Sequence, residues 1–289
     1  ALIVGLTAPI IGTYLVHRRL AMLGDGIGHI SLTGVALGWL AGTFANVSPA
    51  DSWAIPGAVI ISLLGAITIE LVRQSGRTSG DTALAMLFYG GIAGGVLLIG
   101  LAGGTSAQLN SYLFGSISTV RWSDITLITG LGIAIVALGV GLAPALFSVT
   151  NDEDFARSTG LPVRTLSLLI AILSALTVAV AMRVVGSLLV SALMVIPVAI
   201  AQLGARSFRS TMAIAMALGV IICTCGLCLT YFVDLSPGAT IVVGAIGLYA
   251  IGFTIRAIVD RIRRVRRLRA VRGHNQHPER EHPAHADAS

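Results

Sequence analysis

The sequence contains no lysine and few charged residues of any kind. Charged residues make up 11% of the 289 residues, whereas about 25% is usual in soluble domains. Hydrophobic residues make up 55%, and the mean hydropathy is +0.89. This composition excludes an ordinary soluble protein and predicts an all-α polytopic membrane protein, because a helix of about 20 apolar residues spans a bilayer.

Several motif classes are also missing. No glycine cluster is followed by the Lys-Ser or Lys-Thr pair of a phosphate-binding loop, so the chain has no ATP-binding motif of its own. Neither HExxH nor GxSxG occurs, and we therefore predict that the chain is not an enzyme. The three cysteines all lie in the apolar run CTCGLC at 223–228. They suggest no disulfide framework, and small buried side chains are favoured over a thiolate metal site.

The positive charge is concentrated near the C-terminus. All nineteen basic residues are Arg, and nine of them lie between Arg256 and Arg280. Such a run beside a membrane helix favours contact with anionic membrane lipid and gives no reason to expect a nucleic-acid partner. We expect residues 261–289 to form a disordered, cytoplasmic tail rich in Arg and His. Loose metal capture by its four histidines is the alternative.

Nine apolar segments predict eight or nine transmembrane helices in one membrane domain, residues 1–260. The segments lie near residues 1–16, 28–46, 53–72, 82–104, 125–149, 165–182, 184–204, 211–233 and 238–258. Arg pairs or runs follow the first, third, fifth, seventh and ninth segments. By the positive-inside rule these connections are cytoplasmic. We interpret the first segment as a membrane segment and not as a signal peptide.

Two stretches do not fit simple membrane spans. Only Met182 and Arg183 separate the sixth and seventh segments, which indicates a tight turn or a broken or re-entrant helix. The stretch 109–125 is amphipathic, and we expect it to lie at the outer interface or to dip into the protein.

A polar stripe begins the second apolar segment. Asp25, His29 and Thr33 recur every four residues and share one face of a helix, within roughly 80°. A carboxylate and an imidazole on one face are suitable ligands for a borderline divalent cation. The alternative is structural, with Asp25 capping the helix and His29 hydrogen-bonded inside the bundle, because two ligands do not complete a metal site.

A glycine stripe lies on the opposite side of the same helix. Gly34, Gly38 and Gly42 also recur every four residues, and small residues at this spacing allow a neighbouring helix to approach closely. We therefore expect one face of this helix to line a path and the other to pack against protein.

The longest polar connection, residues 151–165, predicts a short helix. Asp154, Ala156 and Gly160 have the spacing of an amphipathic helix that ends at glycine, and Pro162 cannot prolong it. Such a helix lying along the membrane presents a face to a cytosolic partner. The alternative is an ordinary connection with a glycine cap.

Several stretches together resemble one family in their order along the chain. They are Gly24-Asp25, three residues and His29; Asp81-Thr82; Tyr112–Gly115; the run 160–201; and the VDLSPG stretch around Asp234. The chain resembles the ABC-3 permeases, membrane subunits of bacterial zinc, manganese or iron ABC importers. The run from Asp154 to Gly160 is similar to the EAAxxxG loop by which ABC permeases dock their ATPases, with Asp154 and Phe155 replacing Glu and Ala.

The resemblance implies a type II importer fold in a bacterial plasma membrane. It implies a homodimer around a central path, a pair of cytosolic ATPases and an extracytoplasmic metal-binding protein. Asp25 and His29 would face that path, and two-fold symmetry would supply two of each. A transported divalent metal is expected, with no permanently bound cofactor. Zinc is favoured over manganese or iron because His ligation is common for zinc.

Two other functions are alternatives to metal-ion import. The first is the same machine carrying a metal chelate such as haem or a siderophore, which the Asp25–His29 pair disfavours because a bulky chelate needs a wide apolar lumen. The second is a proton-coupled metal transporter, which requires acid relays inside the membrane. Apart from Asp25, the acidic residues mostly lie near segment ends.

Two membrane depths are possible for Asp25 and His29. We expect Asp25 and His29 at the midplane or in the outer half of the membrane. Arg18 and Arg19 precede Asp25 by only six or seven residues, about 9–10 Å along a continuous helix. A continuous helix would keep Asp25 nearer the cytoplasm, so the outer position requires an extended chain before Gly24 or buried Arg side chains.

Overall fold

The computed structural model describes residues 1–47, 50–75, 80–103, 110, 112–115, 122–187, 189–233 and 235–274, and its regular elements there are all helical. The helices are α1 (Leu2–His17), α2 (Ala21–Phe44), the short 3₁₀ helix η1 (Ala50–Trp53), α3 (Ala54–Ser75), α4 (Gly80–Leu101), α6 (Trp122–Gly141), α7 (Ala143–Asn151), α8 (Glu153–Ser158), α9 (Val163–Val185), α10 (Val190–Gln202), α11 (Phe208–Phe232) and α12 (Pro237–His274). Residues 109, 111 and 116–121 of the amphipathic stretch 109–125, and Asp234, lie outside the described residues.

Each predicted apolar segment corresponds to a helix or to a bent helix pair. Six helices are long and apolar enough to cross a membrane, and α6 with α7, bent by 67°, would make a seventh. Helices α1 and α10 are apolar but have only 16 and 13 residues. The all-α, multi-pass membrane architecture is confirmed, whereas the length criterion gives six or seven spans instead of eight or nine.

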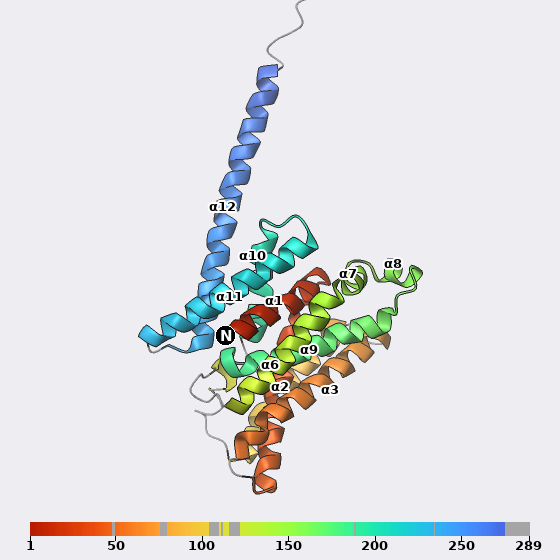
Figure 1. Ribbon diagram of the computed structural model, residues 1–289, viewed down its shortest axis with the longest axis vertical. Coiled ribbons are helices and arrows are strands. Elements are labelled where there is room, and N and C mark those ends of the chain that lie inside the picture. The colour runs from red at the N-terminus through yellow and green to blue at the C-terminus, as the bar shows by residue number, and fades with distance from the viewer. Residues whose placement is uncertain are drawn as a thin grey trace, which may run out of the picture. The chain divides into compact units, whose positions relative to one another are not determined.

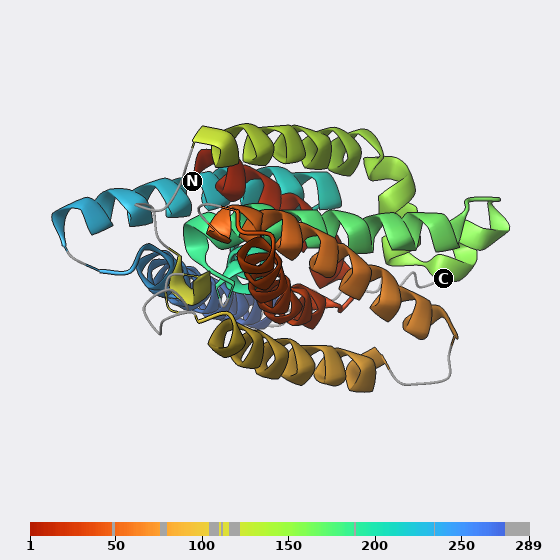
Figure 2. The same ribbon diagram turned by 90° about the horizontal axis from the view of Figure 1, so that it is seen from below.

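Helix α2 lies at the centre of the packing within residues 1–249. It packs most extensively against α4 and α3, and it also contacts α9 and α10. Figure 2 shows α6 and α4 on opposite sides of the layer that contains α2, α3 and α9. The connection after α6 places α7 and α8 next to each other (Figure 1).

The C-terminal region forms a second compact unit, residues 250–289. Helix α12 continues to His274, so the Arg-rich segment 261–274 is helical where the sequence predicts a disordered tail. A run of straight-chain Arg residues is compatible with this, since Arg is a good helix former. The remaining tail, with three of its four histidines, lies outside the described residues.

The contact between α2 and α3 depends on glycine. A methyl group on Gly34 would lie 2.6 Å from the carbonyl oxygen of Gly57, and one on Gly38 would overlap the carbonyl oxygen of Trp53. Gly42, one turn further on, is also buried. The backbones of α2 and α3 are therefore in direct contact, as small residues at a four-residue spacing allow.

This contact predicts that Gly38→Ala destabilises the protein. The added methyl group would meet rigid backbone, so the helices must separate, at roughly 1–3 kcal/mol as for other overpacked sites. Thermal unfolding in detergent would measure the change. Gly130→Ala is the matched control because nothing lies within 4 Å of a methyl group there, and equal stability of the two variants would contradict the close contact.

Candidate functional site

Asp25 and His29 lie one turn apart near the start of α2. The distance between Asp25 Oδ1 and His29 Nε2 is 3.8 Å, which is too long for a hydrogen bond. The His29 residue is 3% exposed, whereas the Asp25 side chain is 23% exposed. Metal–ligand distances of about 2.0–2.2 Å would allow both atoms to reach one ion.

The imidazole of His29 has an unusual environment. The ring of Phe88, from α4, packs against it edge-on, with centroids 4.2 Å apart. Its Nδ1 atom is buried, and no hydrogen-bond partner for it is found in the described part of the chain. An unpaired buried polar atom costs about 1–3 kcal/mol. Within the described residues, the Nδ1 atom therefore lacks the hydrogen bond that the structural alternative assigns to His29.

The carboxylate of Asp25 is oriented by a residue that is distant in sequence. Ser191, in the first turn of α10, donates a hydrogen bond of 3.0 Å to Asp25 Oδ1. Sequence analysis missed Ser191, and the only signal was the very short link between the sixth and seventh apolar segments.

That link contains a break between two helices, which begins at Gly186. Helix α9 ends at Val185, Gly186 has a positive φ of 91°, and α10 begins at Val190. The Ser187 carbonyl approaches α2 so closely that a methyl group on Gly28 would lie 2.8 Å from it. Non-helical backbone at membrane depth is tolerated where it is buried in protein or lines a cavity. The break thus brings the start of α10 to Asp25.

A cavity of about 490 Å³ opens beside the pair. It is lined by Met22, Asp25, Gly26, Leu84, Ala85, Phe88 and Tyr89. Its walls therefore come from α2 and α4, and Asp25 is the one charged residue among the lining residues. A cation entering this cavity would meet a single carboxylate on an otherwise largely apolar wall.

Thr33 lies further along the same face but has a different environment. Its hydroxyl group donates a 2.7 Å hydrogen bond to the carbonyl oxygen of Gly91 in α4. It borders a second cavity, of about 600 Å³, which lies between α2, α3 and α4. The bond to Gly91 ties α2 to α4, and a role for Thr33 in a path stays a prediction.

The turn before α2 bears on the expected membrane depth of Asp25. Arg19 adopts a positive φ of 60°, and Leu20 N donates to Leu15 O at 2.8 Å, which closes α1 with a compact αL turn. Helix α2 is continuous from Ala21, so Asp25 is only about 6 Å along the helix from its start. The chain before Gly24 is therefore not extended, but the Arg18 side chain is buried, which is the other condition for an outer position, so the depth of Asp25 stays a prediction.

The short helix predicted in the 151–165 connection is present as α8. The Asp152 side chain caps its N-terminus by accepting hydrogen bonds from the backbone N–H groups of Asp154 and Phe155. Gly160 follows the helix with a φ of 79°, and Leu161 N donates to Ala156 O at 3.1 Å. This closing turn requires a left-handed residue, which explains the glycine.

The three predicted docking residues do not face the same way. The Asp154 side chain is 93% exposed, and a side chain added at Gly160 would meet open space. Ala156 is fully buried, so it packs against the chain itself and is not available to a partner. Phe155, 60% exposed, is the large apolar side chain on the outer face of α8.

Comparison with known proteins places this arrangement in a family. The ABC 3 transport family model matches residues 1–256. The chain is 31% identical over 253 residues to the manganese transport system membrane protein MntC of Halalkalibacterium halodurans, covering 88% of this chain and 84% of that protein. It is 30% identical over 247 residues to the high-affinity zinc uptake system membrane protein ZnuB of Haemophilus influenzae, covering 85% and 90%.

A solved structure supports the same assignment. The PsaBC structure from Streptococcus pneumoniae, in complex with Fab, superposes with a TM-score of 0.76 at 31% identity and covers 88% of each chain. The family match covers α2, which carries Asp25 and His29, and it also covers α8. The chain therefore belongs to the ABC 3 transport family of membrane-spanning transport proteins.

Proposed function

We propose that this chain is the membrane-spanning permease subunit of an ATP-driven importer of divalent metal ions. The observation that carries the proposal is the Asp25–His29 pair, whose carboxylate reaches a cavity while one imidazole nitrogen is buried without a partner. The names of the relatives, which include manganese and zinc transport systems, support a metal cargo.

The metal-binding site would be completed by a second copy of the chain. Among the described residues, no group of three or more His, Cys, Asp and Glu side chains could hold a metal ion, and two ligands do not complete a site. A homodimer would place two Asp25 and two His29 around one axis. Exposed apolar residues beside the cavity, such as Met86 and Tyr89 of α4, would then be covered.

The proposed cargo is a borderline divalent cation. Carboxylate oxygen and imidazole nitrogen together suit Mn²⁺, Fe²⁺ and Zn²⁺, and the relatives' names include manganese more often than zinc. We therefore give Mn²⁺ and Zn²⁺ equal weight, whereas the sequence alone favoured zinc.

Each side chain would have a defined task during passage of the ion. The Asp25 carboxylate would replace part of the hydration shell, with Ser191 holding its orientation, and His29 would bind as the neutral imidazole. A transport site must also release its ion, so two weakly enclosed ligands per chain suit passage better than a closed structural site. The ion enters and leaves unchanged, so no catalytic residue is needed in this chain.

The buried acidic residue of α3, Glu70, gives no support to the proton-coupled alternative. Glu70 is 3% exposed, but Arg73 binds both of its carboxylate oxygens, at 2.8 and 3.0 Å. A carboxylate fixed by a guanidinium in this way is a poor proton carrier. We propose instead that cytosolic ATPases docking at α8 supply the energy, and that an extracytoplasmic binding protein delivers the metal.

Removing either ligand should reduce uptake of radioactive Mn²⁺ or Zn²⁺ to background in cells. Without these ligands, nothing in the path replaces the hydration shell that the ion must lose. Asp25→Ala should be the more severe change because it removes a charge as well as a ligand. His17→Ala is the matched control, since it removes an imidazole that bonds to Thr13 O outside the cavity. Near-normal uptake by both ligand variants, at wild-type membrane levels, would reduce the pair to a structural role.

The docking role of α8 predicts a selective effect of Gly160→Trp. The bulky side chain would project into open space in the isolated chain and block the approach of the ATPase, while the positive φ would add about 1–2 kcal/mol of local strain. Pull-down of the co-expressed ATPase would measure the loss. Gly160→Asn is the control because Asn tolerates this conformation, and unchanged pull-down by Gly160→Trp together with Phe155→Ala would exclude docking at α8.

A further inference from the structure

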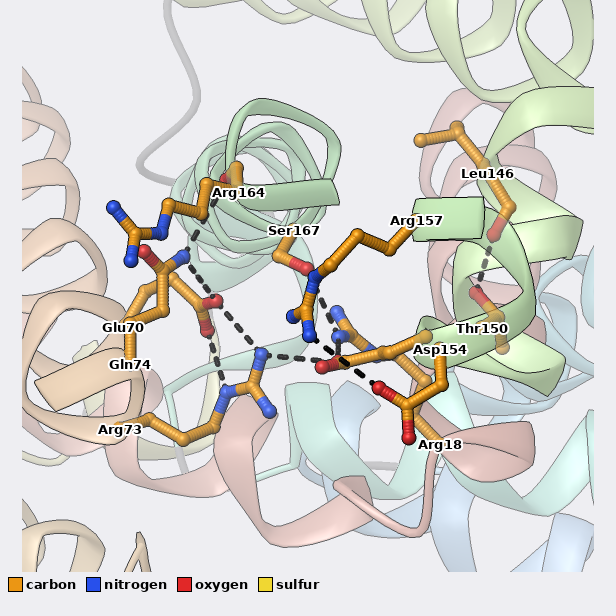
Figure 3. A network of polar contacts seen from close by, with 11 residues as sticks. Arg18, Glu70, Arg73, Gln74, Leu146, Thr150, Asp154, Arg157, Arg164 and Ser167 are labelled. Carbon is orange, nitrogen blue, oxygen red and sulfur yellow. Dashed lines mark hydrogen bonds and ion pairs between the residues drawn. The ribbon is translucent and has the colours of Figure 1, made fainter. Parts of the chain in front are cut away.

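Four charged side chains meet where α8 lies against the helix bundle. We call this set, Arg18, Glu70, Arg73 and Glu153, the charge cluster. Arg18 follows α1, Glu70 and Arg73 lie in the last two turns of α3, and Glu153 is the first residue of α8. Figure 3 shows the pair of Glu70 and Arg73 joined by dashed lines, with Arg18 among the other labelled residues. The two positive and two negative charges balance.

Glu153 joins the two arginines. Its Oε1 atom pairs with Arg18 and also accepts a 3.3 Å hydrogen bond from Arg73 Nη2 (Figure 3). Arg18 donates a further bond of 3.0 Å to Ser167 Oγ of α9, while Arg73 holds Glu70. A single carboxylate of α8 is thus the link between the end of α1 and the end of α3.

Two members of the cluster are buried and two are partly exposed. The side chains of Arg18 and Glu70 are 4% and 3% exposed, whereas those of Arg73 and Glu153 are 27% and 37% exposed. Burial opposes ionisation of Glu153, but the charges and hydrogen bonds of Arg18 and Arg73 outweigh it and lower its pKa. Glu153 is therefore charged at neutral pH, and separating it from its partners would leave buried charges uncompensated.

We propose that Glu153 is the positioning residue that transmits movement of α8 to the helices carrying Asp25 and His29. The inference rests on the proposed docking of an ATPase at α8. The docking residues of α8 would bind the ATPase. Glu153 instead contacts the helix bundle, through its ion pairs with Arg18 and Arg73.

The packing of α2 explains how such a movement would reach the metal ligands. Arg18 lies three residues before α2, and Arg73 belongs to α3. The backbones of α2 and α3 are in contact at Gly34 and Gly57, so a displacement of α3 acts directly on α2. Glu153 therefore holds α3 and the turn that leads into α2, at the end of α2 where Asp25 lies.

One wall of the site is not part of that pair. Ser191 belongs to α10, whereas α4 is itself in backbone contact with α2, because a methyl group on Gly91 would lie 2.6 Å from the backbone of His29. Displacement of α2 and α3 would change the distance from Asp25 to Ser191, and with it the orientation of the carboxylate in the cavity. The link is an ion pair whose Arg18 member is buried, so breaking it would leave a buried charge without its partner. Made and broken states of the pair are therefore distinct, and such two-state elements carry coupling between sites.

The test uses the complete complex, in which the chain is assembled with its ATPase subunits in proteoliposomes and supplied with its binding protein. The measured quantity is the number of Mn²⁺ ions imported per ATP hydrolysed. In Glu153→Gln, the ATPase should remain bound and active, but this ratio should fall by about tenfold, within the usual range for coupling between sites.

Two further variants separate transmission from stability. Arg157→Gln removes a charge from the same helix, where its 3.4 Å pair with Asp154 is exposed, and it should leave the ratio unchanged. The double variant Arg73→Gln/Glu153→Gln restores the charge balance, so it should recover normal membrane levels while the ratio stays low.

Several outcomes would overturn the proposal. A normal ratio in Glu153→Gln would show that the cluster does not transmit movement. Full recovery of the ratio in the double variant would show that only charge balance matters. Loss of ATPase binding in Glu153→Gln would make Glu153 a docking residue. Failure of the wild-type chain to bind any ATPase would instead contradict the proposed function.

Discussion

The close backbone contact between α2 and α3 is the constraint on which the rest of the structure depends. Gly34, Gly38 and Gly57 allow the two helices to touch along one side of α2. Because that side is occupied by backbone, the opposite side of α2 is directed toward α4, and the polar stripe lies there. The same contact joins Asp25 mechanically to α3, whose far end carries Glu70 and Arg73.

The local features of this arrangement could be predicted from sequence because they depend on helix periodicity. The four-residue spacing placed Asp25 and His29 on one face and Gly34 on the other, and a glycine followed by proline predicted the short helix α8. Periodicity reports only on neighbours within a helix. The bond from Ser191 to Asp25 and the pair between Arg18 and Glu153 join residues 166 and 135 positions apart, so no local pattern contains them.

Other differences have similarly physical causes. The break between α9 and α10 falls at Gly186 and not at Arg183, because the positive φ at that position suits glycine. Ala156 is buried because one face of a helix as short as α8 must cover the bundle. The depth of Asp25 depends on the turn at Arg19, where an arginine takes up a conformation that sequence rules assign to glycine or asparagine.

The burial of Arg18 has a consequence for how the chain is made. The positive-inside rule acts during membrane insertion, when the connection between α1 and α2 is still unfolded and both arginines of the pair are in water. In the folded chain Arg18 is withdrawn into the charge cluster, while Arg19 remains exposed. Arg18 therefore counts toward the positive-inside bias of the sequence and, in the folded chain, is an internal counter-ion for Glu153.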